Sequence, residues 1–464
     1  MLQRGGSPEF PRRHARVASI APMPTPEPSS SGPAPRPLPS TGAGLGLLET
    51  LAFFRDPDFA PRRFERHGDV FETLLLGERM VFIRGGPAIS DLLAQPEAVE
   101  GWWPESVKQL LGSRSLANRN GEAHWARRRV VGQLFSAAAL RRYSPGIAAL
   151  IEELAAELRA ASEAIPLAER MRRFAFSVIA TTVLGLEGND REALFRDFEI
   201  WTRALFSLPL ALPGSPYARA LAARQRLLRR LRQVLAEASE HRRGGLDLLI
   251  GGLDEAGLPL GDDDLVEQLL LLLFAGYETT ASSLSCLMRA LLLDPELETW
   301  LRRETDQLAW PPAPEQATTA YEPGRAPRLD ALVQEVLRFT PPVGGFFRRT
   351  RQPLLLAGVE VPANRVVQVA LAASNRYAPG SPGSDLEQFR PQRHLEEGCP
   401  ALLLPFGGGE RVCLGKALSE LEIRLMVVGL LQQVRLQLAP AQDLSLQSLP
   451  SPSPRDGLRV EVAG

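Results

Sequence analysis

The stretch that decides the fold is residues 405–415, which read PFGGGERVCLG. Its three consecutive glycines let the backbone turn tightly and approach a flat partner, because no Cβ atom stands in the way. Cys413 then falls at the start of an amphipathic helix, where free N–H groups and the positive end of the helix dipole favour the thiolate. Such a thiolate suits an axial ligand of haem iron. A buried, inert cysteine after a glycine-rich turn is an equally good interpretation of these features alone.

The order of residues within this loop is more specific than its composition. Phe406, Gly409, Arg411, Cys413 and Gly415 stand at a spacing that resembles the haem-binding loop of the cytochrome P450 monooxygenases. The resemblance implies that Cys413 binds the iron of haem b (iron protoporphyrin IX), that Arg411 contacts a haem propionate, and that Phe406 packs beside the sulfur. Gly415 is expected to leave space above the thiolate.

Glu335 and Arg338 lie three residues apart on a predicted helix, so their side chains can meet. Alone, they would be an ordinary surface pair. In the P450 family, which these motifs resemble, the same Glu-x-x-Arg pair is buried, and an arginine from a later loop joins it to brace the haem loop. Arg393 matches that third member, whereas Gln392 and His394 stand where the family usually has a glutamate and an aromatic residue.

A second motif interrupts the leucines of a long predicted helix, where residues 275–280 read AGYETT. Ala275 and Thr279 share a face, and the Thr279 hydroxyl can bond to the Ala275 carbonyl, which bends a helix and opens a groove. A simple kink in a core helix is the alternative, but burying Glu278 without a role would be costly. The motif resembles the oxygen-activation segment of the P450 family, which implies that Thr279 and Glu278 are catalytic and act as a general-acid chain.

Three more basic residues match propionate-binding positions of the family. His124 and Arg128 are four residues apart and match its propionate-binding helix, and Arg348 matches another propionate arginine on a later segment. Trp125 and Arg129 form a competing pair on the adjacent helix face. We favour His124 and Arg128 because they lie eleven and seven residues before Phe135, the first residue of a Phe-Ser pair. Each arginine alone would be a solvated surface charge, and only the order of the matches along the chain indicates a role in binding propionates.

The composition sets outer limits on the function. The 464 residues contain 53 basic and 54 acidic side chains and 44% hydrophobic residues. Proportions this ordinary exclude a disordered, collagen-like or disulfide-scaffold chain, and a near-zero net charge argues against a nucleic-acid partner. The three cysteines are too few and too unevenly spaced for a disulfide framework, which indicates a reducing compartment. Besides Cys413, we expect Cys286 in the long apolar helix and Cys399 in a loop to be inert.

Residues 1–40 hold ten prolines and few apolar clusters, which predicts a flexible Pro-rich arm. A bland tail or a translation start at Met23 explains its arginines better than a transit peptide. Residues 41–464 show no convincing linker or repeat and are expected to form a single haem-binding monooxygenase domain. No stretch of 18 apolar residues occurs, so we expect no transmembrane anchor and a soluble, cytoplasmic protein, which we take to be a monomer.

Helical periodicity dominates beyond residue 40, with small islands of strand. We therefore expect a mainly α protein with small β-sheets and, from the resemblance, the P450 fold with a long central helix over the haem. The expected elements, in chain order, are a hairpin of residues 69–74 and 80–83, helices within 122–250, a long helix 262–294, a loop 311–327, a helix 329–339, strands within 354–369 and a last helix 414–434.

Several segments are similar to the retinoic-acid-hydroxylating branch of the P450 family and its soluble cyanobacterial relatives. They are residues 103–112 (WPESVKQLLG), 115–118 (SLAN), 274–280 (FAGYETT) and 341–348 (PPVGGFFR). A long apolar pocket is expected there, although core packing is the better interpretation of any single aromatic residue. The expected lining residues are Trp103, Ala275, Gly276, Val343 and Phe346, with Trp102 and Phe347 beside them.

These resemblances together imply a haem-thiolate monooxygenase that hydroxylates a long apolar, retinoid or isoprenoid substrate similar to retinoic acid. The reaction would use O2 and electrons from a separate ferredoxin-type donor with its reductase, since the sequence has no flavin or iron–sulfur motif. We expect that donor to dock on basic residues near the cysteine, namely Arg127, Arg129, Lys416 and Arg424.

Other functions stay open from the sequence alone. A sterol or fatty-acid hydroxylase shares parts of the branch motifs. A peroxide-using or isomerising haem-thiolate enzyme is a second alternative, against which the intact Glu278–Thr279 pair argues. A non-catalytic haem-based sensor or carrier is a third.

Overall fold

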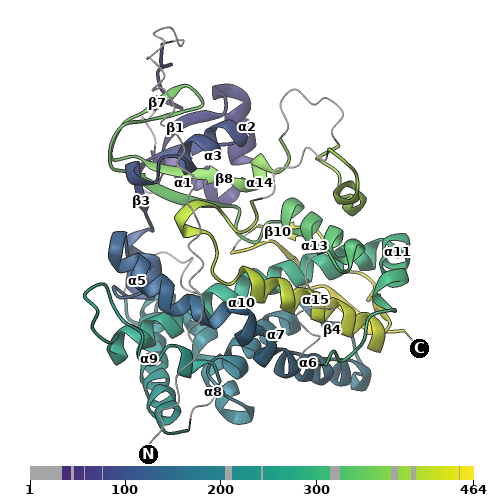
Figure 1. Ribbon diagram of the computed structural model, residues 1–464. Coiled ribbons are helices and arrows are strands. Elements are labelled where there is room, and N and C mark those ends of the chain that lie inside the picture. Colours follow the sequence, from purple (N-terminus) through teal and green to yellow (C-terminus); the bar gives the residue numbers. More distant parts are fainter. Residues whose placement is uncertain are drawn as a thin grey trace, which may run out of the picture. The chain divides into compact units, whose positions relative to one another are not determined.

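Helices make up most of the described chain, as the periodicity predicts (Figure 1). The chain from Arg36 onward forms one compact unit. Cys399 and residues 1–33 of the expected arm lie outside the part that the structure describes. The computed structural model describes residues 34–42, 46–56, 58–75, 77–203, 212–241, 244–313, 324–377, 385–398, 404–448 and 450–463.

The α-helices follow the predicted order. They are α1 (Gly46–Arg55), α2 (Phe59–His67), α3 (Gly86–Leu93), α4 (Glu105–Leu111), α5 (Gly121–Gly132), α6 (Ala137–Ala160), α7 (Leu167–Thr182), α8 (Gly188–Thr202), α9 (Pro216–His241), α10 (Asp262–Leu293), α11 (Pro295–Thr305), α13 (Pro327–Phe339), α14 (Leu371–Ser374) and α15 (Lys416–Gln433). Short 3₁₀ turns connect them: η2 (Pro96–Ala98), η3 (Leu116–Asn118), η4 (Gln133–Phe135), η5 (Leu246–Leu248), η6 (Pro391–Leu395) and η7 (Gly409–Arg411).

The largest sheet has the strand order β1-β2-β8-β5-β3. Its strands are β1 (Val70–Leu75), β2 (Glu78–Ile83), β3 (Val99–Gly101), β5 (Gly345–Thr350) and β8 (Val366–Ala370). The predicted hairpin is confirmed, since β1 and β2 pair antiparallel with Phe71 opposite Phe82. Three small sheets are β4 (Ile165–Pro166) with β12 (Arg459–Val462) and β9 (Leu436–Leu438), β6 (Leu354–Leu356) with β7 (Val359–Val361), and β10 (Leu446–Gln447) with β11 (Ser453–Pro454).

The strands expected from the sequence do not include β3 or β5. Gly345 is the first residue of β5 and pairs with Ala370 of β8. A Cβ atom on Gly345 would lie 2.1 Å from the Val369 carbonyl oxygen, so the glycine lets the two strands approach. The strand therefore carries Phe346 and Arg348 on a sheet rather than on a loop.

The long helix α10 lies at the centre of the helical region, where α15 crosses it (Figure 1). Asp262, Asp263 and Asp264 place acidic side chains in its first turn, and Pro295 starts the next helix directly after it. Its 32 residues span about 48 Å at a rise of 1.5 Å per residue. Its leucines belong to one core with residues of α6, α7, α9 and α15. The predicted central helix is confirmed.

By length and composition alone, α10 could also cross a membrane. Its most apolar window has a mean hydropathy of 1.3, but 67% of that window is buried inside the protein. A helix whose apolar side chains are already covered by neighbouring helices is typical of a protein core.

The expected arm extends too far at its C-terminal end. The N–H of Arg36 donates to the Gly358 carbonyl, 2.9 Å away, and its carbonyl accepts from Glu360. The Glu72 N–H likewise donates to the Pro39 carbonyl, 2.7 Å away. Residues 36–40 therefore belong to the compact unit, because these backbone bonds tie them to β7 and β1. The prolines among these residues made strand pairing unexpected, because proline has no N–H to donate.

Candidate functional site

The cysteine loop folds back on itself before α15 begins. Gly407 and Gly409 have φ angles of +71° and +67°, which side chains with a Cβ atom rarely adopt. The Cys413 N–H then donates to the Phe406 carbonyl, 2.9 Å away. A Cβ atom on Gly415 would lie 3.9 Å from the Cys413 sulfur. The glycines thus bring the sulfur close to the N-terminus of α15 without covering it.

The surroundings of Cys413 act on its thiol in two directions. The pKa of the Cys413 thiol lies above its usual value, because the protein atoms packed on one side of the sulfur disfavour a charge there more than the backbone N–H groups of Gly415 and Lys416 and the guanidinium of Arg128 favour it. The other side of Cys413 is exposed, so among the residues that the structure describes no side chain covers the sulfur. A polarised, accessible sulfur with donors aimed at it fits a single soft ligand for iron.

Four basic side chains gather beside this loop. His124 and Arg128 come from α5, Arg348 from β5 and Arg411 from η7. Burial and the three neighbouring guanidinium groups lower the pKa of His124 to about 4. Burial and the nearby Arg411 lower the pKa of Arg348 to about 10.

Little negative charge balances this cluster. Within the described residues, the shortest distance from these four side chains to a carboxylate is 4.0 Å, between Arg411 and Glu410. The Arg411 Nε is buried and has no hydrogen-bond partner. Grouped cations that weaken one another's protonation favour binding of an anion. The two propionates of haem supply two such charges, so the residues present fit haem.

The arginines of this cluster are held by backbone carbonyls. Arg411 donates to the Arg119 carbonyl, 2.6 Å away, and to the side chain of Asn120. A Cβ atom on Gly101 would lie 2.4 Å from Arg411 Cζ, so the glycine gives the guanidinium its place. Arg348 donates to the Phe347 carbonyl, 2.8 Å away.

The tertiary structure distinguishes between the two candidate pairs on α5. His124 is buried, with 3% of its surface exposed, and belongs to the cluster. Trp125 is 48% exposed, and Arg129 is exposed as well. The structure therefore brings His124 and Arg128 to the cysteine loop and leaves the competing pair in solvent.

Behind the loop, Glu335 and Arg338 form a fully buried ion pair, with 2.7 Å between Nε and Oε2. Arg393 joins it at 3.1 Å from Glu335 Oε1. Burial opposes ionisation of Glu335, but hydrogen bonds from Arg338, His394 and the Arg390 N–H lower its pKa to about 2. The structure thus brings the three predicted bracing residues together and adds His394, which sequence reasoning had only noted as a departure.

The motif in α10 has the local geometry that its spacing suggests. The Thr279 hydroxyl donates to the Ala275 carbonyl, 2.6 Å away. Ala275 is exposed although most of α10 is buried, so this part of the helix faces open space. Glu278 lies 3.4 Å from the guanidinium of Arg172 on α7. Sequence reasoning missed Arg172, because 106 residues separate it from its partner.

The five expected lining residues have different surroundings. Val343 is 45% exposed. Phe346 lies near the cysteine loop, 4.0 Å from the position of a Cβ atom on Gly407. A Cβ atom on Gly276 would instead lie 3.2 Å from Ile179 of α7, so this glycine serves helix packing rather than an open pocket.

The aromatic residues near the expected pocket divide in a similar way. Trp102 is buried and packs edge-on against Phe347, and both belong to a core cluster under the sheet. Trp103 lies farther from the same ring, with 6.5 Å between centroids, and is half-buried. Core packing therefore accounts for Trp102 and Phe347.

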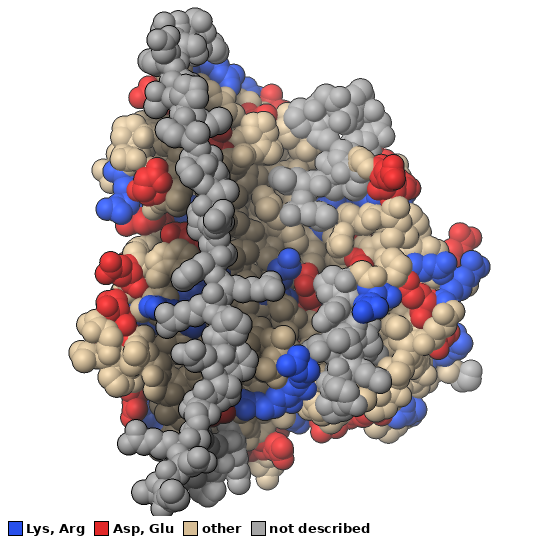
Figure 2. Space-filling view, viewed as in Figure 1, with Lys and Arg blue, Asp and Glu red and all other residues tan. Residues whose placement is uncertain are grey.

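Two of the four expected docking cations are buried, so this part of the expectation is wrong. Arg127 pairs with Asp264 at 2.8 Å, and Arg424 pairs with Asp330 at 2.7 Å. Helical spacing could not show that these side chains face inward. Arg129 and Lys416 are exposed. On the face drawn in Figure 2, basic and acidic side chains are interspersed rather than gathered in one large patch.

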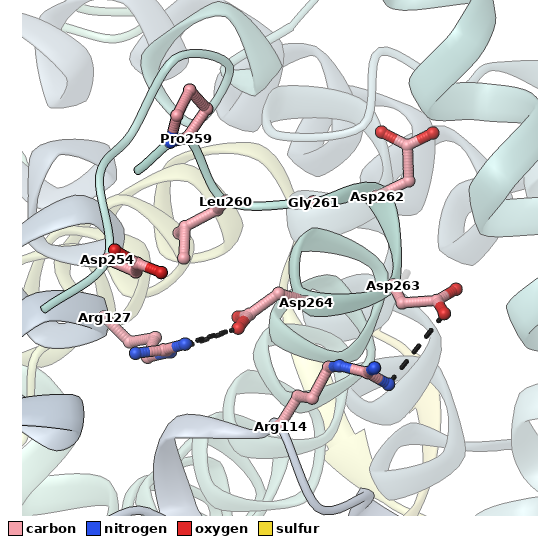
Figure 3. A pocket seen from close by; sticks show the side chains of 9 residues that line it. All are labelled: Arg114, Arg127, Asp254, Pro259, Leu260, Gly261, Asp262, Asp263 and Asp264. Atoms are coloured by element: carbon pink, nitrogen blue, oxygen red, sulfur yellow. Dashed lines mark hydrogen bonds and ion pairs between the residues drawn. The ribbon is translucent and has the colours of Figure 1, made fainter. Parts of the chain in front are cut away.

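A surface pocket of about 440 Å³ lies elsewhere, at the N-terminus of α10. Figure 3 shows Arg127 directed at Asp264 and Arg114 at Asp263 within it. It contains neither the cysteine nor Thr279, so it is not the site of the predicted chemistry. Its lining residues are Arg114, Arg127, Asp254 and residues 259–264.

Comparisons with known proteins point in one direction. A family model described as Cytochrome P450 matches residues 35–452. The chain is 35% identical over 423 residues to the putative cytochrome P450 120 of Synechocystis sp., covering 89% of this chain and 94% of that protein. It is 30% identical over 421 residues to human cytochrome P450 26B1, covering 88% of this chain and 82% of that protein.

Solved structures give the same result. The structure of retinoic-acid-bound cyanobacterial CYP120A1 superposes with a TM-score of 0.84 at 32% identity, covering 93% of this chain and 100% of that chain. A cytochrome P450 described as CYP102L1 superposes with a TM-score of 0.75 at 20% identity, covering 87% of this chain and 97% of that chain, and supports the fold alone.

Proposed function

The chain belongs to the cytochrome P450 family, whose members are haem-dependent monooxygenases, and from this premise we propose that it hydroxylates a long apolar substrate of retinoid or isoprenoid type. The observation that carries the substrate class is the 32% identity, over nearly the whole chain, to a P450 structure with retinoic acid bound. The similarity to human cytochrome P450 26B1 and the motifs of residues 103–118 support the same class.

We propose haem b as the cofactor, with Cys413 as the residue that would bind its iron. Arg128, Arg348 and Arg411 would neutralise the two propionates, and His124, which is uncharged at neutral pH, would donate a hydrogen bond to one of them. The uncompensated positive charge of the three arginines supports this assignment. When bound, haem supplies the activation of O2 and the transfer of one oxygen atom into a C–H bond.

Within the pocket, the chain's own residues hold and move protons. The Thr279 hydroxyl donates its one proton to the Ala275 carbonyl, and rotation of the hydroxyl would redirect that proton to the open side of α10. Glu278 takes protons from solvent, and its contact with Arg172 sets the position of its carboxylate. This chain of an acid and an alcohol is the proposed catalytic relay.

For the substrate, we propose an apolar lining made of Ala275, Phe346, Val343 and Trp103. Ala275 presents only a methyl group on the open side of α10, which leaves room for a long chain of carbon atoms. Phe346 lies beside the cysteine loop, where its ring would meet the part of a substrate nearest the sulfur.

Electrons are proposed to come from a ferredoxin-type protein with its reductase. Two exposed cations come from the elements that flank the cysteine loop: Arg129 follows Arg128, which donates to the Val412 carbonyl, and Lys416 begins α15. The 48% exposed ring of Trp125 lies on the same helix as Arg129 and one turn before it. Cations around an exposed aromatic ring suit an acidic protein partner. We further propose that the enzyme is a cytoplasmic monomer.

A ligand panel tests this proposal. The purified haem-loaded protein is titrated with all-trans-retinoic acid, a fatty acid and a sterol, and displacement of water from the iron is followed as a Soret shift. We expect retinoic acid to give the largest shift and, with O2, a plant-type ferredoxin and its reductase, a hydroxylated product. Cys413→Ser should lose the thiolate-type spectrum of the carbon monoxide complex.

Three results would contradict the proposal. A shift and product with the sterol or fatty acid but not the retinoid would assign a different substrate class. Turnover with peroxide but not with the reductant would indicate a peroxide-using enzyme. Carbon monoxide binding without consumption of reductant with any lipid would indicate a haem sensor.

A further inference from the structure

The segment of residues 112–120 connects α4 to α5, and its backbone is bound by side chains of α10. The Arg114 N–H donates to Glu267 Oε2, 2.7 Å away. The Leu116 N–H donates to Gln268 Oε1, 2.8 Å away, and Gln268 Nε2 returns a bond of 2.8 Å to the Arg114 carbonyl. Two consecutive residues of α10 thus satisfy three backbone groups of a segment that is about 150 positions away in sequence.

Gln268 is fully committed to these contacts. Its second amide hydrogen points to Asp264 Oδ1, 2.8 Å away, and the other oxygen of Asp264 accepts from Arg127 (Figure 3). Only 1% of Gln268 is exposed. An apolar residue in its place would leave the buried Leu116 N–H without a partner, which is costly, and would remove the bond to the Arg114 carbonyl.

Glu267 is held on its other side by α9. Arg224 donates to Glu267 Oε1, 2.8 Å away, and to the Leu110 carbonyl at 2.9 Å. Gly112 has a φ of +97°, and a Cβ atom there would lie 2.2 Å from the carboxyl carbon of Glu267. The segment therefore passes directly against the carboxylate, and only a glycine fits at that point.

The far end of the same segment contacts Arg411, one of the four basic side chains beside the cysteine loop. The Arg119 carbonyl and the Asn120 side chain accept from the Arg411 guanidinium. Between the two ends, Asn118 Nδ2 donates to the Gly112 carbonyl at 2.7 Å and to the Lys108 carbonyl at 3.1 Å. Internal bonds and anchors at both ends make the segment a strut from α10 to Arg411.

We propose that Glu267 and Gln268 are positioning residues that hold the strut of residues 112–120 and, through it, set the guanidinium of Arg411. The proposal rests on the proposed role of Arg411 toward a haem propionate. It assigns the first polar turns of α10 a part in holding the cofactor, although Glu267 and Gln268 lie about three turns of helix from Thr279. Loosening the strut therefore weakens cofactor retention without touching the cysteine or the proton relay.

The test compares Gln268→Leu with Gln307→Leu in the haem-loaded protein. Gln307 is a suitable control because it is exposed and its amide donates to a carbonyl of its own helix end, that of Arg303. Hydrogen exchange read by mass spectrometry should become on the order of tenfold faster for residues 112–120 in Gln268→Leu, since buried backbone bonds of this kind are lost. Transfer of haem to apomyoglobin should become on the order of several-fold faster, and the midpoint potential should shift. The control should match the parent protein in all three measurements.

A second variant guards against failure of the first to fold. Gly112→Ala adds a methyl group on the strut itself, where it would collide with the Glu267 carboxylate. It should therefore also speed hydrogen exchange of residues 112–120. Unchanged exchange at 112–120 in the folded variants would overturn the proposal. So would a uniform rise that includes α6 and α15, or faster exchange at 112–120 with unchanged haem transfer and potential. None of these readouts needs a substrate, so a failure of the retinoid assignment is distinguishable from a failure of the strut.

Discussion

The imidazole Nε2 of His394 lies 2.8 Å from Oε2 of Glu335, and both side chains are almost completely buried. Glu335 also receives Arg338 and Arg393, so its carboxylate has cationic or N–H partners on each side. His394 stands where the P450 family usually has an aromatic residue. A histidine ring is also flat and aromatic, and in addition it can form a hydrogen bond. His394 therefore joins the network of side chains around Glu335.

We expect His394→Phe to lower the stability of the protein by about 1–3 kcal/mol, because Glu335 loses one hydrogen bond in a site that water cannot enter. His394→Gln keeps a donor and should recover much of that loss. Guanidinium chloride unfolding of the three proteins measures the difference. Equal midpoints for the parent protein and His394→Phe would show that the bond contributes nothing.

The pKa of Glu335, lowered to about 2 from an ordinary value of 4.5, predicts an acid-dependent stability. Because the folded protein binds this proton less tightly than the unfolded chain, the contribution is fully present above about pH 4.5. It is lost as pH falls toward 2. The difference in unfolding free energy between the parent protein and Glu335→Gln should therefore shrink over that range, by an amount on the order of 3 kcal/mol. A difference that stays constant with pH would contradict the assignment.

Thr279→Ala should uncouple O2 consumption from product formation. Removing the hydroxyl takes away the proposed proton donor on the open side of α10. We expect the product formed per reductant consumed to fall on the order of tenfold or more. Ser285→Ala is the matched control, since its hydroxyl makes the same bond to a carbonyl four residues earlier in the same helix but is buried. Equal coupling in both variants would rule out the relay.

His124 should titrate at about pH 4 in the haem-free protein, well below the ordinary value of 6.5. Burial and three guanidinium groups disfavour its charged form, so the unfolded chain binds this proton more tightly than the folded protein does. The free energy of unfolding should therefore decrease as pH falls from about 6.5 to 4. Binding of the two propionates should raise this pKa, because they offset the arginines. Proton NMR of the imidazole signals, assigned with His124→Gln, measures both values. An identical pKa with and without haem would place the propionates elsewhere.

Charge reversal at Arg129 and Lys416 should weaken electron transfer from a plant-type ferredoxin. We expect the double variant Arg129→Glu, Lys416→Glu to slow first-electron transfer on the order of tenfold at low salt, with a smaller difference at high salt. Arg229→Glu, an exposed arginine on α9, serves as the control. A salt-independent rate, or equal slowing by the control, would argue against docking next to the cysteine loop.

Local sequence was sufficient for the parts of this protein that depend on spacing. The glycines and cysteine of residues 405–415, the Glu335–Arg338 pair and the back-bonded Thr279 each lie within a few positions of one another. Helical geometry or a tight turn then brings such neighbours together wherever the element is placed. The central helix and the hairpin β1–β2 followed from periodicity in the same way.

Tertiary packing alone decided which face of each helix is buried. The spacing of α5 allowed either His124 with Arg128 or Trp125 with Arg129, and it could not show that Arg127 turns inward to Asp264. The contacts of Arg172 with Glu278 and of Gln268 with Leu116 join residues more than 100 positions apart. Periodicity specifies only which side chains share a face, whereas burial and long-range hydrogen bonds depend on what packs against that face.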